Sequence, residues 1–381
     1  MTDSKRVYLS PPCMNGSEIE YIQSAFRENR IAPLGANVDL FEEMLCAFTG
    51  SPFAVALSAG TAAIHLGLLW LGVRAGDRVF CSDVTFSASC NPIRYLGAEP
   101  VFIDSDEESW NMSPALLERA LSEAKREGRL PKAVVVVDLY GCPADYARIL
   151  PLCEEYGVPV LEDAAEALGA SYRGRMCGTF GKVGALSFNG NKLITTSGGG
   201  MALTQEKAAA EKIKFWSTQA REPAPHYEHK EIGYNYRLSN ICAGIGCGQM
   251  KTVRENLARR AQIHAAYRKG FAGLPIAFSP ELGGAEPNHW LTVIRFTAPG
   301  IAVRDVMEVL ERENIESRPF WKPMHMQPVY ADAPFYAESG TPLGERLFAA
   351  GLCLPSGMAL TPEQQEKIIG IVRDVAGRES R

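Results

Sequence analysis

Runs of like charge are absent from this 381-residue sequence, and 39 Lys plus Arg nearly balance 44 Asp plus Glu. A net charge of −5 without a basic cluster argues against a surface that mainly binds nucleic acid or an anionic membrane. The ten cysteines include no C-x-x-C pair and no histidine at ligand spacing, so neither a metal site nor a redox pair is predicted. There is no internal repeat or low-complexity tract. We expect reduced thiols in a reducing cytoplasm.

We also expect neither a secretory signal nor a membrane span from this sequence. Met1–Ser10 is polar and has no apolar core of the kind that a secretory signal needs, so export is not expected. Phe53–Val73 contains no Asp, Glu, Lys or Arg over a length that could cross a bilayer. However, S-A-G-T from Ser58 to Thr61 is a turn signal between a strand pattern and a helix pattern. We therefore predict a strand followed by a helix there, in a cytoplasmic protein.

What the sequence does contain is an alternation of short apolar runs and helical patterns. The helical patterns include Thr61–Val73, Ser113–Glu127 and Ala144–Tyr156. This order predicts an α/β fold with a seven-stranded, mainly parallel sheet covered on both faces. Ligands of such sheets collect where the strands end, so functional residues are expected just after each strand. The seven strand candidates are Phe53–Leu57, Arg78–Cys81, Pro100–Ile103, Ala133–Leu139, Val158–Leu161, Gly184–Phe188 and Gly200–Leu203.

The last third of the chain predicts a smaller C-terminal α+β domain. Leu238 to Phe271 has one long helical pattern without proline, Leu291–Phe296 is typical of a strand, and Val303–Asn314 is typical of a helix. The proline-rich segment Arg318–Tyr330 predicts an ordered loop. We therefore expect an N-terminal arm at 1–15, a large domain at 16–255 and a small domain at 256–381.

The first candidate site lies where a strand runs through Ser58-Ala59-Gly60-Thr61 into a helix. Backbone N–H groups at a helix start, together with the Thr61 hydroxyl and the helix dipole, can bind a phosphate. An ordinary N-capped helix, in which Gly60 serves only the turn, is the alternative.

Two further candidates follow later strands. Asp163 ends a buried strand, where a carboxylate needs a cation such as a protonated pyridine nitrogen; a helix cap or a structural ion pair is the alternative. Lys192 stands in a polar loop after a strand, with Ser187 and the glycines 198–200 nearby, and a lysine in such a setting can form a Schiff base. A phosphate cradle, an aspartate and then a lysine 29 residues later is the order expected of a pyridoxal-phosphate enzyme.

At this point the sequence resembles the DegT/DnrJ/EryC1/StrS family of nucleotide-sugar aminotransferases, which have the aspartate-aminotransferase fold, fold type I. The likeness covers nearly the whole chain. Ser217–Glu222 and Ser187–Gly200 look most like the aminotransferases of the UDP-N-acetylbacillosamine pathway. Besides the three candidate sites, the residues that carry the likeness are S-P-P at 10–12, Ile31–Gly35, Tyr227–His229, Gly233–Asn240, Arg318-Pro319 and His325–Pro328.

The resemblance implies a role for each matching residue. Lys192 would bind pyridoxal phosphate as a Schiff base and shuttle the proton, and Asp163 would keep the ring nitrogen protonated so that the ring can take up electrons. Phe86 matches the aromatic residue that stacks on the ring. Glu166 matches a position near the ring hydroxyl where the family often has Gln or His, so its hydrogen bond there needs a shared or extra proton. The phosphate-binding positions correspond to Gly60, Thr61 and Ser187.

Partner and substrate positions follow from the same resemblance. The family is dimeric with shared active sites, and Asn235 matches an asparagine that reaches the cofactor phosphate of the neighbouring subunit. An active homodimer is therefore expected. His325 matches a substrate contact, although a satisfied loop histidine is equally compatible with the sequence. The other positions matched to substrate contacts are Asn29, Ile31, Ala32, Pro33 and Arg318.

The function that this resemblance implies is transfer of an amino group from L-glutamate to the 4-keto carbon of a UDP-linked 2-acetamido-2,6-dideoxy-4-keto sugar. A TDP- or GDP-linked 4-keto or 3-keto sugar is an alternative substrate. A sugar 3-dehydratase of the same fold would have histidine in place of Lys192. A regulatory protein that binds the cofactor without turnover is the rival from another class, although no basic face is appended. His65, Trp70 and Trp290 are interpreted as packing residues.

Overall fold

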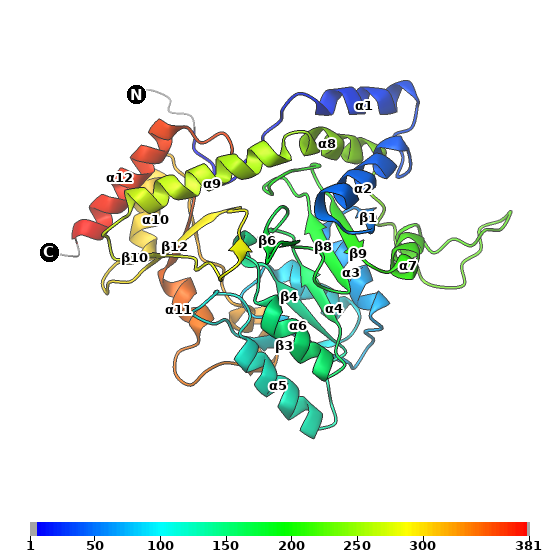
Figure 1. Cartoon of the computed structure of the whole chain (residues 1–381), viewed down its shortest axis with the longest axis horizontal. Coiled ribbons are helices and arrows are strands. Elements are labelled where there is room, and N and C mark those ends of the chain that lie inside the picture. The colour runs from blue at the N-terminus through cyan, green and yellow to red at the C-terminus, as the bar shows by residue number, and fades with distance from the viewer. Residues whose placement is uncertain (1–5, 379–381) are drawn as a thin grey trace.

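The computed structural model describes residues 6–378, and its main feature is a mixed eight-stranded sheet (Figure 1). The strand order is β1-β9-β8-β5-β4-β2-β3-β14. β9 runs antiparallel to both of its neighbours, and the other pairs are parallel. The bounds are β1 Phe53–Leu57, β2 Arg78–Ser82, β3 Glu99–Ile103, β4 Ala133–Val137, β5 Val160–Asp163, β8 Val183–Ser187, β9 Gly200–Thr204 and β14 Phe335–Tyr336.

All seven predicted strands form this sheet, and the prediction of seven strands is wrong by one. The eighth, β14, has two residues and joins the edge from a part of the chain assigned to the small domain. Two residues carry no alternation pattern, so this strand has no sequence signal.

Helices cover both faces of the large sheet because successive strand residues point to opposite sides. One face packs under α3, α4 and α7. The other face packs under α2 and α8 at one end and under α5 and α6 at the other. The helix bounds are α1 Glu18–Arg27, α2 Ala36–Thr49, α3 Gly60–Trp70, α4 Asn91–Tyr95, α5 Pro114–Arg126, α6 Tyr146–Glu155, α7 Lys207–Ser217, α8 Asn240–Met250, α9 Val253–Gly270, α10 Val303–Arg312, α11 Leu343–Ala350 and α12 Pro362–Arg378.

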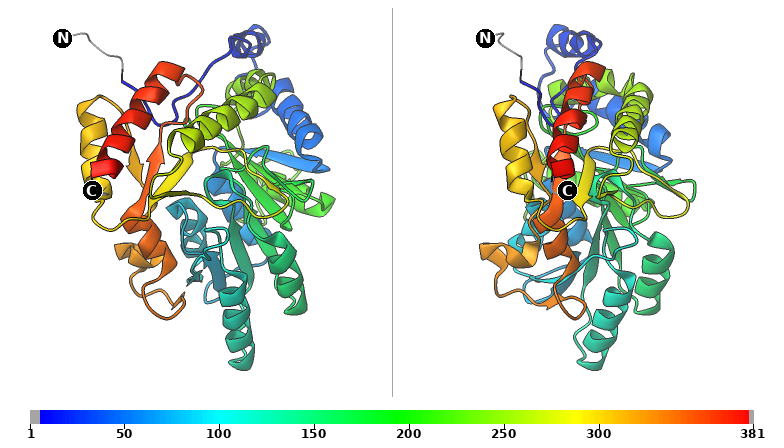
Figure 2. Two further views of the ribbon diagram at one scale, coloured as in Figure 1. Left: turned by 60° about the vertical axis from the view of Figure 1, so that its left-hand side comes forward. Right: turned by 90° about the vertical axis from the view of Figure 1, so that its left-hand side faces the viewer.

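A second, antiparallel sheet lies beside the first and has the order β10-β12-β15-β13. One of its faces packs against α9, α10 and α12, and the other packs against α11 and an aromatic cluster that reaches back to the large sheet. Figure 2 shows α9 extending from beside α8 to the small sheet. The strand bounds are β10 Ile276–Phe278, β12 Thr292–Phe296, β13 Arg318–Pro319 and β15 Gly351–Leu354; a third sheet is formed by β6 Ser171–Tyr172, β7 Arg175–Met176 and β11 Ala285–Glu286.

The long helical pattern predicted from Leu238 to Phe271 is divided in two. α8 ends at Met250 and α9 begins at Val253, so a single continuous helix is a wrong expectation. Thr252 is the N-cap residue of α9 and has non-helical backbone angles. The break lets α8 pack with α1 while α9 packs with α12 (Figure 1).

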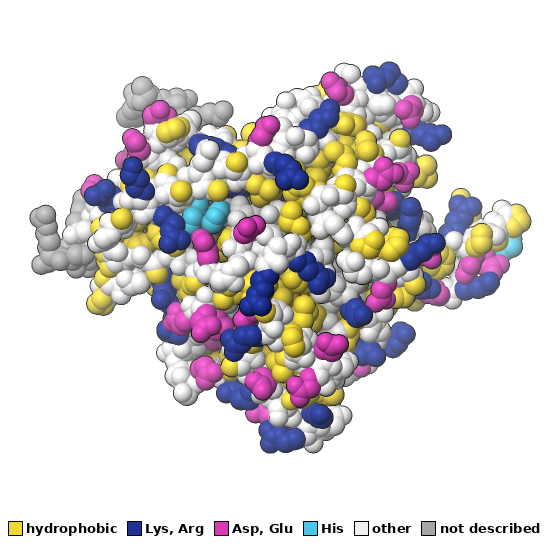
Figure 3. Space-filling view, viewed as in Figure 1, with side chains coloured by type: hydrophobic (Ala, Val, Ile, Leu, Met, Phe, Trp, Pro, Cys, Tyr) yellow, Lys and Arg dark blue, Asp and Glu magenta, His cyan; other side chains and the backbone are white. Residues whose placement is uncertain are grey.

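The predicted domain boundaries stay predictions. The arm at 1–15 and the small domain at 256–381 include residues 1–5 and 379–381, which lie outside the described residues. The first half of the polar start Met1–Ser10 therefore lies outside them too. Among residues 6–378, no helix combines the length and the apolarity needed to cross a bilayer. On the face drawn in Figure 3, basic and acidic side chains are interspersed.

Candidate active site

A cavity of about 1090 Å³ lies at the carboxyl ends of the strands, between the large and the small sheet. Its walls come from the β1–α3 turn, the loop after β2, the end of β5, the loop after β8 and the segment that enters β12. These are the places where the carboxyl ends of a parallel sheet collect ligands. Seven of the predicted site residues meet there together with Arg318, and these seven are Gly60, Thr61, Phe86, Asp163, Glu166, Ser187 and Lys192.

Lys192 reaches into this cavity from the loop after β8. Its side chain is 13% exposed, and its Nζ lies 3.2 Å from Glu166 Oε1 and 4.1 Å from the centroid of the Trp290 ring. The backbone N–H of Lys192 donates to Asn189 O at 3.0 Å, which shapes the loop as a turn. The solvated surface lysine that is the usual alternative is therefore not what the fold presents.

Asp163, the last residue of β5, is a buried carboxylate with a donor on each oxygen. Ser89 Oγ donates to Oδ2 at 2.5 Å, and the N–H of Ala165 donates to Oδ1 at 3.1 Å. Burial raises the pKa of Asp163, whereas these two hydrogen bonds and the charge of Lys192 lower it. A carboxylate held this way can stabilise a cation in the cavity.

Glu166 lies next to Lys192 and is nearly fully buried. Its Oε2 accepts the backbone N–H of Tyr140 at 2.7 Å, and its Oε1 faces the lysine. Burial raises the pKa of Glu166 to about 7, even though Lys192 lowers it. This carboxyl group can therefore either hold or release a proton near neutral pH.

The start of α3 offers an anion site. Its N-cap residue is Ala59, which has no side-chain acceptor, so no capping side chain satisfies the first-turn N–H groups beside Gly60 and Thr61. A Cβ on Gly60 would lie 3.0 Å from the Cβ of Ser187, so the glycine allows α3 to start against β8. The ordinary N-capped helix that was the alternative is absent here.

Phe86 adds an aromatic face. It is 59% exposed although it is a large apolar residue, and its ring lies 5.8 Å from that of Trp321. An anion cradle, a buried carboxylate, an amine and an open aromatic face around one cavity are a donor set that fits pyridoxal phosphate.

The model of the DegT/DnrJ/EryC1/StrS aminotransferase family matches residues 12–373. The chain belongs to this family. It is a pyridoxal-phosphate-dependent sugar aminotransferase of fold type I.

Relatives support the same assignment over nearly full length. EpsN of Bacillus subtilis (strain 168) is 51% identical over 97% of this chain and 95% of that protein. The GDP-perosamine synthase of Escherichia coli O157:H7 is 34% identical over 94% and 96%. The crystal structure of a DegT DnrJ EryC1 StrS aminotransferase from Brucella abortus superposes with a TM-score of 0.88, at 30% identity and 95% coverage of both chains.

Several predicted residues of this aminotransferase lie outside the cavity lining. Asn235 accepts a hydrogen bond from Gln219 Nε2 at 3.0 Å and pairs with Thr218 directly after α7. It lies at the base of the loop that extends from the body after α7 (Figure 1). His325 has both ring nitrogens engaged, by Asp83 Oδ2 at 2.7 Å and Glu345 Oε1 at 3.1 Å, and stacks on Phe335. Its substrate role stays a prediction, beside an evident structural one. The loop between α1 and α2 contains Asn29, Ile31, Ala32 and Pro33.

Other residues of the site carry no clear sequence signal. Ser89, which binds Asp163, stands three residues after Phe86 in the same loop, and that proximity is a usable hint. The interpretation of Trp290 as a packing residue is incomplete, because Trp290 also lines the cavity beneath Lys192. The assignment of His65 to packing agrees with its burial among Tyr95, Tyr234 and Tyr236.

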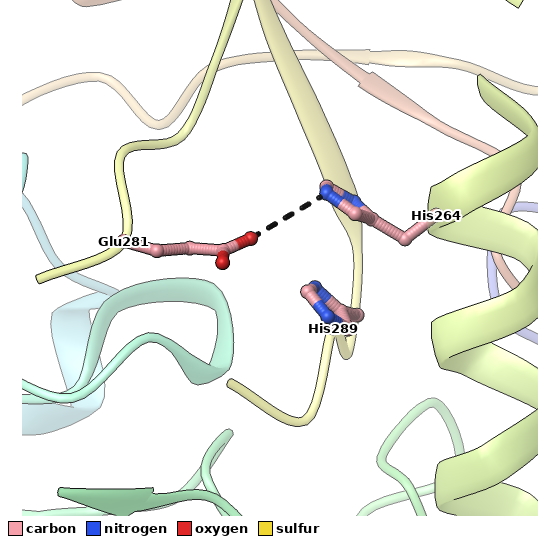
Figure 4. A group of neighbouring side chains, drawn as sticks. All are labelled: His264, Glu281 and His289. Atoms are coloured by element: carbon pink, nitrogen blue, oxygen red, sulfur yellow. Dashed lines mark ion pairs between the residues drawn. The ribbon is translucent and has the colours of Figure 1, made fainter. Parts of the chain in front are cut away.

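A second polar cluster lies away from the cavity and joins His264, Glu281 and His289 (Figure 4). Their possible ligand atoms lie within 4.8 Å of one another. However, the two imidazole rings are stacked, with centroids 4.1 Å apart and planes 12° from parallel. In-plane lone pairs of parallel rings do not converge on one point, so this geometry suits ring stacking better than chelation.

The cluster predicts a pH dependence of stability. Burial, His289 and Arg268 lower the pKa of His264 from 6.5 to about 3. The unfolded chain therefore binds the proton first, so this contribution is fully present above pH 6.5 and is lost as pH falls towards 3. Between pH 7 and pH 5, His264 should cost the wild-type protein about 2 kcal/mol of unfolding free energy.

Urea unfolding at both pH values measures this effect. His264→Phe should lose about 2 kcal/mol less than wild type between pH 7 and pH 5. His226→Phe is the matched control for the loss of an imidazole, because the His226 side chain is 70% exposed and its ion pair with Glu228 lies at the surface. Equal pH dependence in wild type and His264→Phe would contradict the burial argument.

Proposed function

We propose that this aminotransferase moves an amino group from L-glutamate to the 4-keto carbon of a UDP-linked 2-acetamido-2,6-dideoxy-4-keto sugar. The observation that carries the proposal is Lys192 Nζ beside Glu166, in a cavity whose buried carboxylate is Asp163. The UDP sugar is favoured by the bacillosamine-type phrasing of Ser217–Glu222 and Ser187–Gly200. Arg318 and Lys322 line the same cavity and suit the anionic phosphates of a nucleotide sugar.

Different residues of the chain would bind the cofactor and move the protons. Pyridoxal phosphate, when bound, accepts the amino group from the donor, passes it to the acceptor and takes up electrons while protons move. Gly60, Thr61 and Ser187 would bind its phosphate, and Asp163 would hold the proton of its ring nitrogen. Lys192 Nζ would hold the cofactor between turnovers and, once released, carry the proton between donor and cofactor.

Two other residues would orient the cofactor. Phe86 would stack on the ring, since its face is open to the cavity. Glu166 would hydrogen-bond the ring hydroxyl with its own proton, which a pKa of about 7 makes available at neutral pH. This removes the difficulty that a permanently ionised carboxylate would face at that position.

A GDP-linked 4-keto sugar is the second candidate substrate, favoured by the 34% identity to a GDP-perosamine synthase. A TDP-linked sugar or a 3-keto sugar remains a further alternative. The dehydratase reading is disfavoured by Lys192, which that activity replaces with histidine. A cofactor-binding regulator would give no amino-sugar product at all.

A panel of UDP-, TDP- and GDP-linked 4-keto and 3-keto sugars tests the proposal. Each is incubated with L-glutamate and the holoenzyme, and the product is identified by mass spectrometry. The UDP-linked 2-acetamido-4-keto sugar should give the 4-amino product with the highest kcat/KM. A higher kcat/KM with a GDP sugar would replace the proposed substrate, and no product from any sugar would favour the regulator.

We also propose that the enzyme works in the cytoplasm as a homodimer with shared sites. Large apolar side chains are exposed on two segments outside the cavity. On α1 and the following loop they are Ile19, Phe26, Ile31 and Leu34, and on the segment that carries Asn235 they are Tyr227 and Ile232. Exposed apolar side chains gathered on projecting segments favour a subunit interface.

Mixed dimers test the shared site. If Asn235 reaches the partner's cofactor phosphate, a dimer of one Lys192→Ala chain and one Asn235→Ala chain has one site with both defects and one with neither. Exchanging subunits between the two parent proteins should therefore raise activity above both parents. Activity equal to the average of the parents would show that Asn235 serves its own chain's site or none.

A further inference from the structure

The peptide carbonyl of Asn191, directly before Lys192, is held by two donors. Ser10 Oγ donates to it at 2.7 Å, and Trp290 Nε1 also donates to it at 2.7 Å. Ser10 belongs to the N-terminal segment and Trp290 leads into β12, so two distant parts of the sequence meet on one acceptor. Two short hydrogen bonds fix the plane of this peptide, and the peptide sets the direction in which the lysine side chain leaves the backbone.

The face of the same indole lies under the end of the lysine side chain. Nζ is 4.1 Å from the ring centroid of Trp290 and 3.2 Å from Glu166 Oε1. A lysine ammonium is attracted both to an aromatic face and to a carboxylate, and both attractions strengthen in a site with little solvent. Trp290 therefore contacts both the peptide bond that precedes Lys192 and the amine at the end of its side chain.

Trp290 is itself fixed. Its ring is buried and stacks near Tyr140, and its backbone N–H donates to Asn288 Oδ1 at 2.8 Å. Its carbonyl accepts a hydrogen bond from Nη1 of Arg260, a buried guanidinium whose Nη2 donates to Ser10 Oγ at 3.0 Å. Burial without a facing carboxylate lowers the pKa of Arg260 to about 10. The arginine thus joins both residues that hold the Asn191 carbonyl.

We propose that Trp290 is the positioning residue of Lys192: its indole N–H orients the peptide that carries the lysine, and its ring face retains the lysine amine in the cavity. The ring face matters when Nζ is not bonded to the cofactor, because a free amine on a long side chain otherwise samples several rotamers. Glu166 attracts the lysine amine as a carboxylate, and Trp290 attracts it through its ring face. This inference rests on the proposed role of Lys192.

Two substitutions separate the two contacts. Trp290→Phe keeps an aromatic face and loses the N–H donor, whereas Trp290→Leu loses both. Trp110→Phe is the matched control, because Trp110 is a buried tryptophan of the same aromatic cluster and also lies beneath a cation, Arg295 at 5.6 Å. Trp110 does not line the cavity, so its truncation reports packing loss alone.

The first measurement uses the protein without cofactor. Hydrogen–deuterium exchange of the 187–193 peptide should be faster in both Trp290 variants. Losing the donor to Asn191 O loosens the peptide unit whose N–H, on Lys192, donates to Asn189 O. Exchange should be unchanged in Trp110→Phe. The second uses the holoenzyme. Trp290→Phe should lower kcat about threefold and Trp290→Leu about tenfold or more, with KM for glutamate and for the sugar within about twofold of wild type.

The outcomes are separable. Unchanged exchange, or a kcat of Trp290→Leu equal to that of Trp110→Phe, would overturn the proposal, as would a rise in KM with kcat unaffected. Retained activity in Lys192→Ala would instead overturn the role of the lysine. The exchange result does not depend on that role, since it requires no cofactor.

Discussion

Lys192→Ala should abolish transamination and the near-visible absorbance of the lysine-bound cofactor, while the protein stays folded. We expect the side chain to serve chemistry rather than packing, because it lines the cavity and its amine lies beside Glu166 and the Trp290 ring. Steady-state turnover, the absorbance spectrum and circular dichroism of the purified variant measure the three parts of this expectation.

Two further lysine variants serve as a second test and a control for Lys192→Ala. Lys192→Arg should be as inactive as Lys192→Ala, since a guanidinium cannot release a proton near neutral pH. Lys182→Ala should keep wild-type activity, because Lys182 lies at the surface with Glu206. Wild-type turnover in Lys192→Ala, or restored turnover in Lys192→Arg, would remove the lysine from the mechanism.

Asp163→Asn should keep the cofactor bound and lower kcat by at least about a hundredfold. An amide keeps one acceptor oxygen for the N–H of Ala165, and its NH2 group can donate to Ser89 Oγ in place of the oxygen that accepted from it. It cannot hold a proton on the ring nitrogen of the cofactor. The loss should therefore fall on the rate and leave KM nearly unchanged. Steady-state kinetics with a cofactor-occupancy measurement separates rate from affinity.

Glu166→Gln is the control for the loss of kcat expected in Asp163→Asn. It also neutralises a buried carboxyl group of the same cavity, but a glutamine can still hydrogen-bond a ring hydroxyl. It should keep most of its activity. If Asp163→Asn also kept most of its activity, Asp163 would be a structural cap for the N–H of Ala165.

The parts of this enzyme that could be predicted from sequence are those that depend on residues adjacent in the chain. β4 is a run of buried valines, and Asp163 directly ends the next strand, so their places follow from strand patterns and the rule that sites lie at strand ends. The places of Gly60 and Lys192 could be predicted in the same way, because each follows the end of a strand. By contrast, β14 has two residues, and its place depends on pairing with β3, which is far away in the sequence.

The contacts that orient the site could not be predicted in this way. Trp290 is about one hundred residues from Lys192 in sequence, and its meeting with Asn191 depends on how the small sheet packs on the large one. A buried tryptophan and a site tryptophan have the same local pattern. The role proposed for Asn235 would depend on a second subunit, so neither its local sequence nor the structure of one chain could establish it.

The most direct test of the whole account is to locate the covalent bond between protein and cofactor. The enzyme is loaded with pyridoxal phosphate, treated with sodium borohydride so that a C=N bond becomes a stable secondary amine, digested and mapped by mass spectrometry. The account predicts one phosphopyridoxyl group per chain, on Lys192. A modified lysine elsewhere, or a fully loaded protein with no modified lysine, would contradict it.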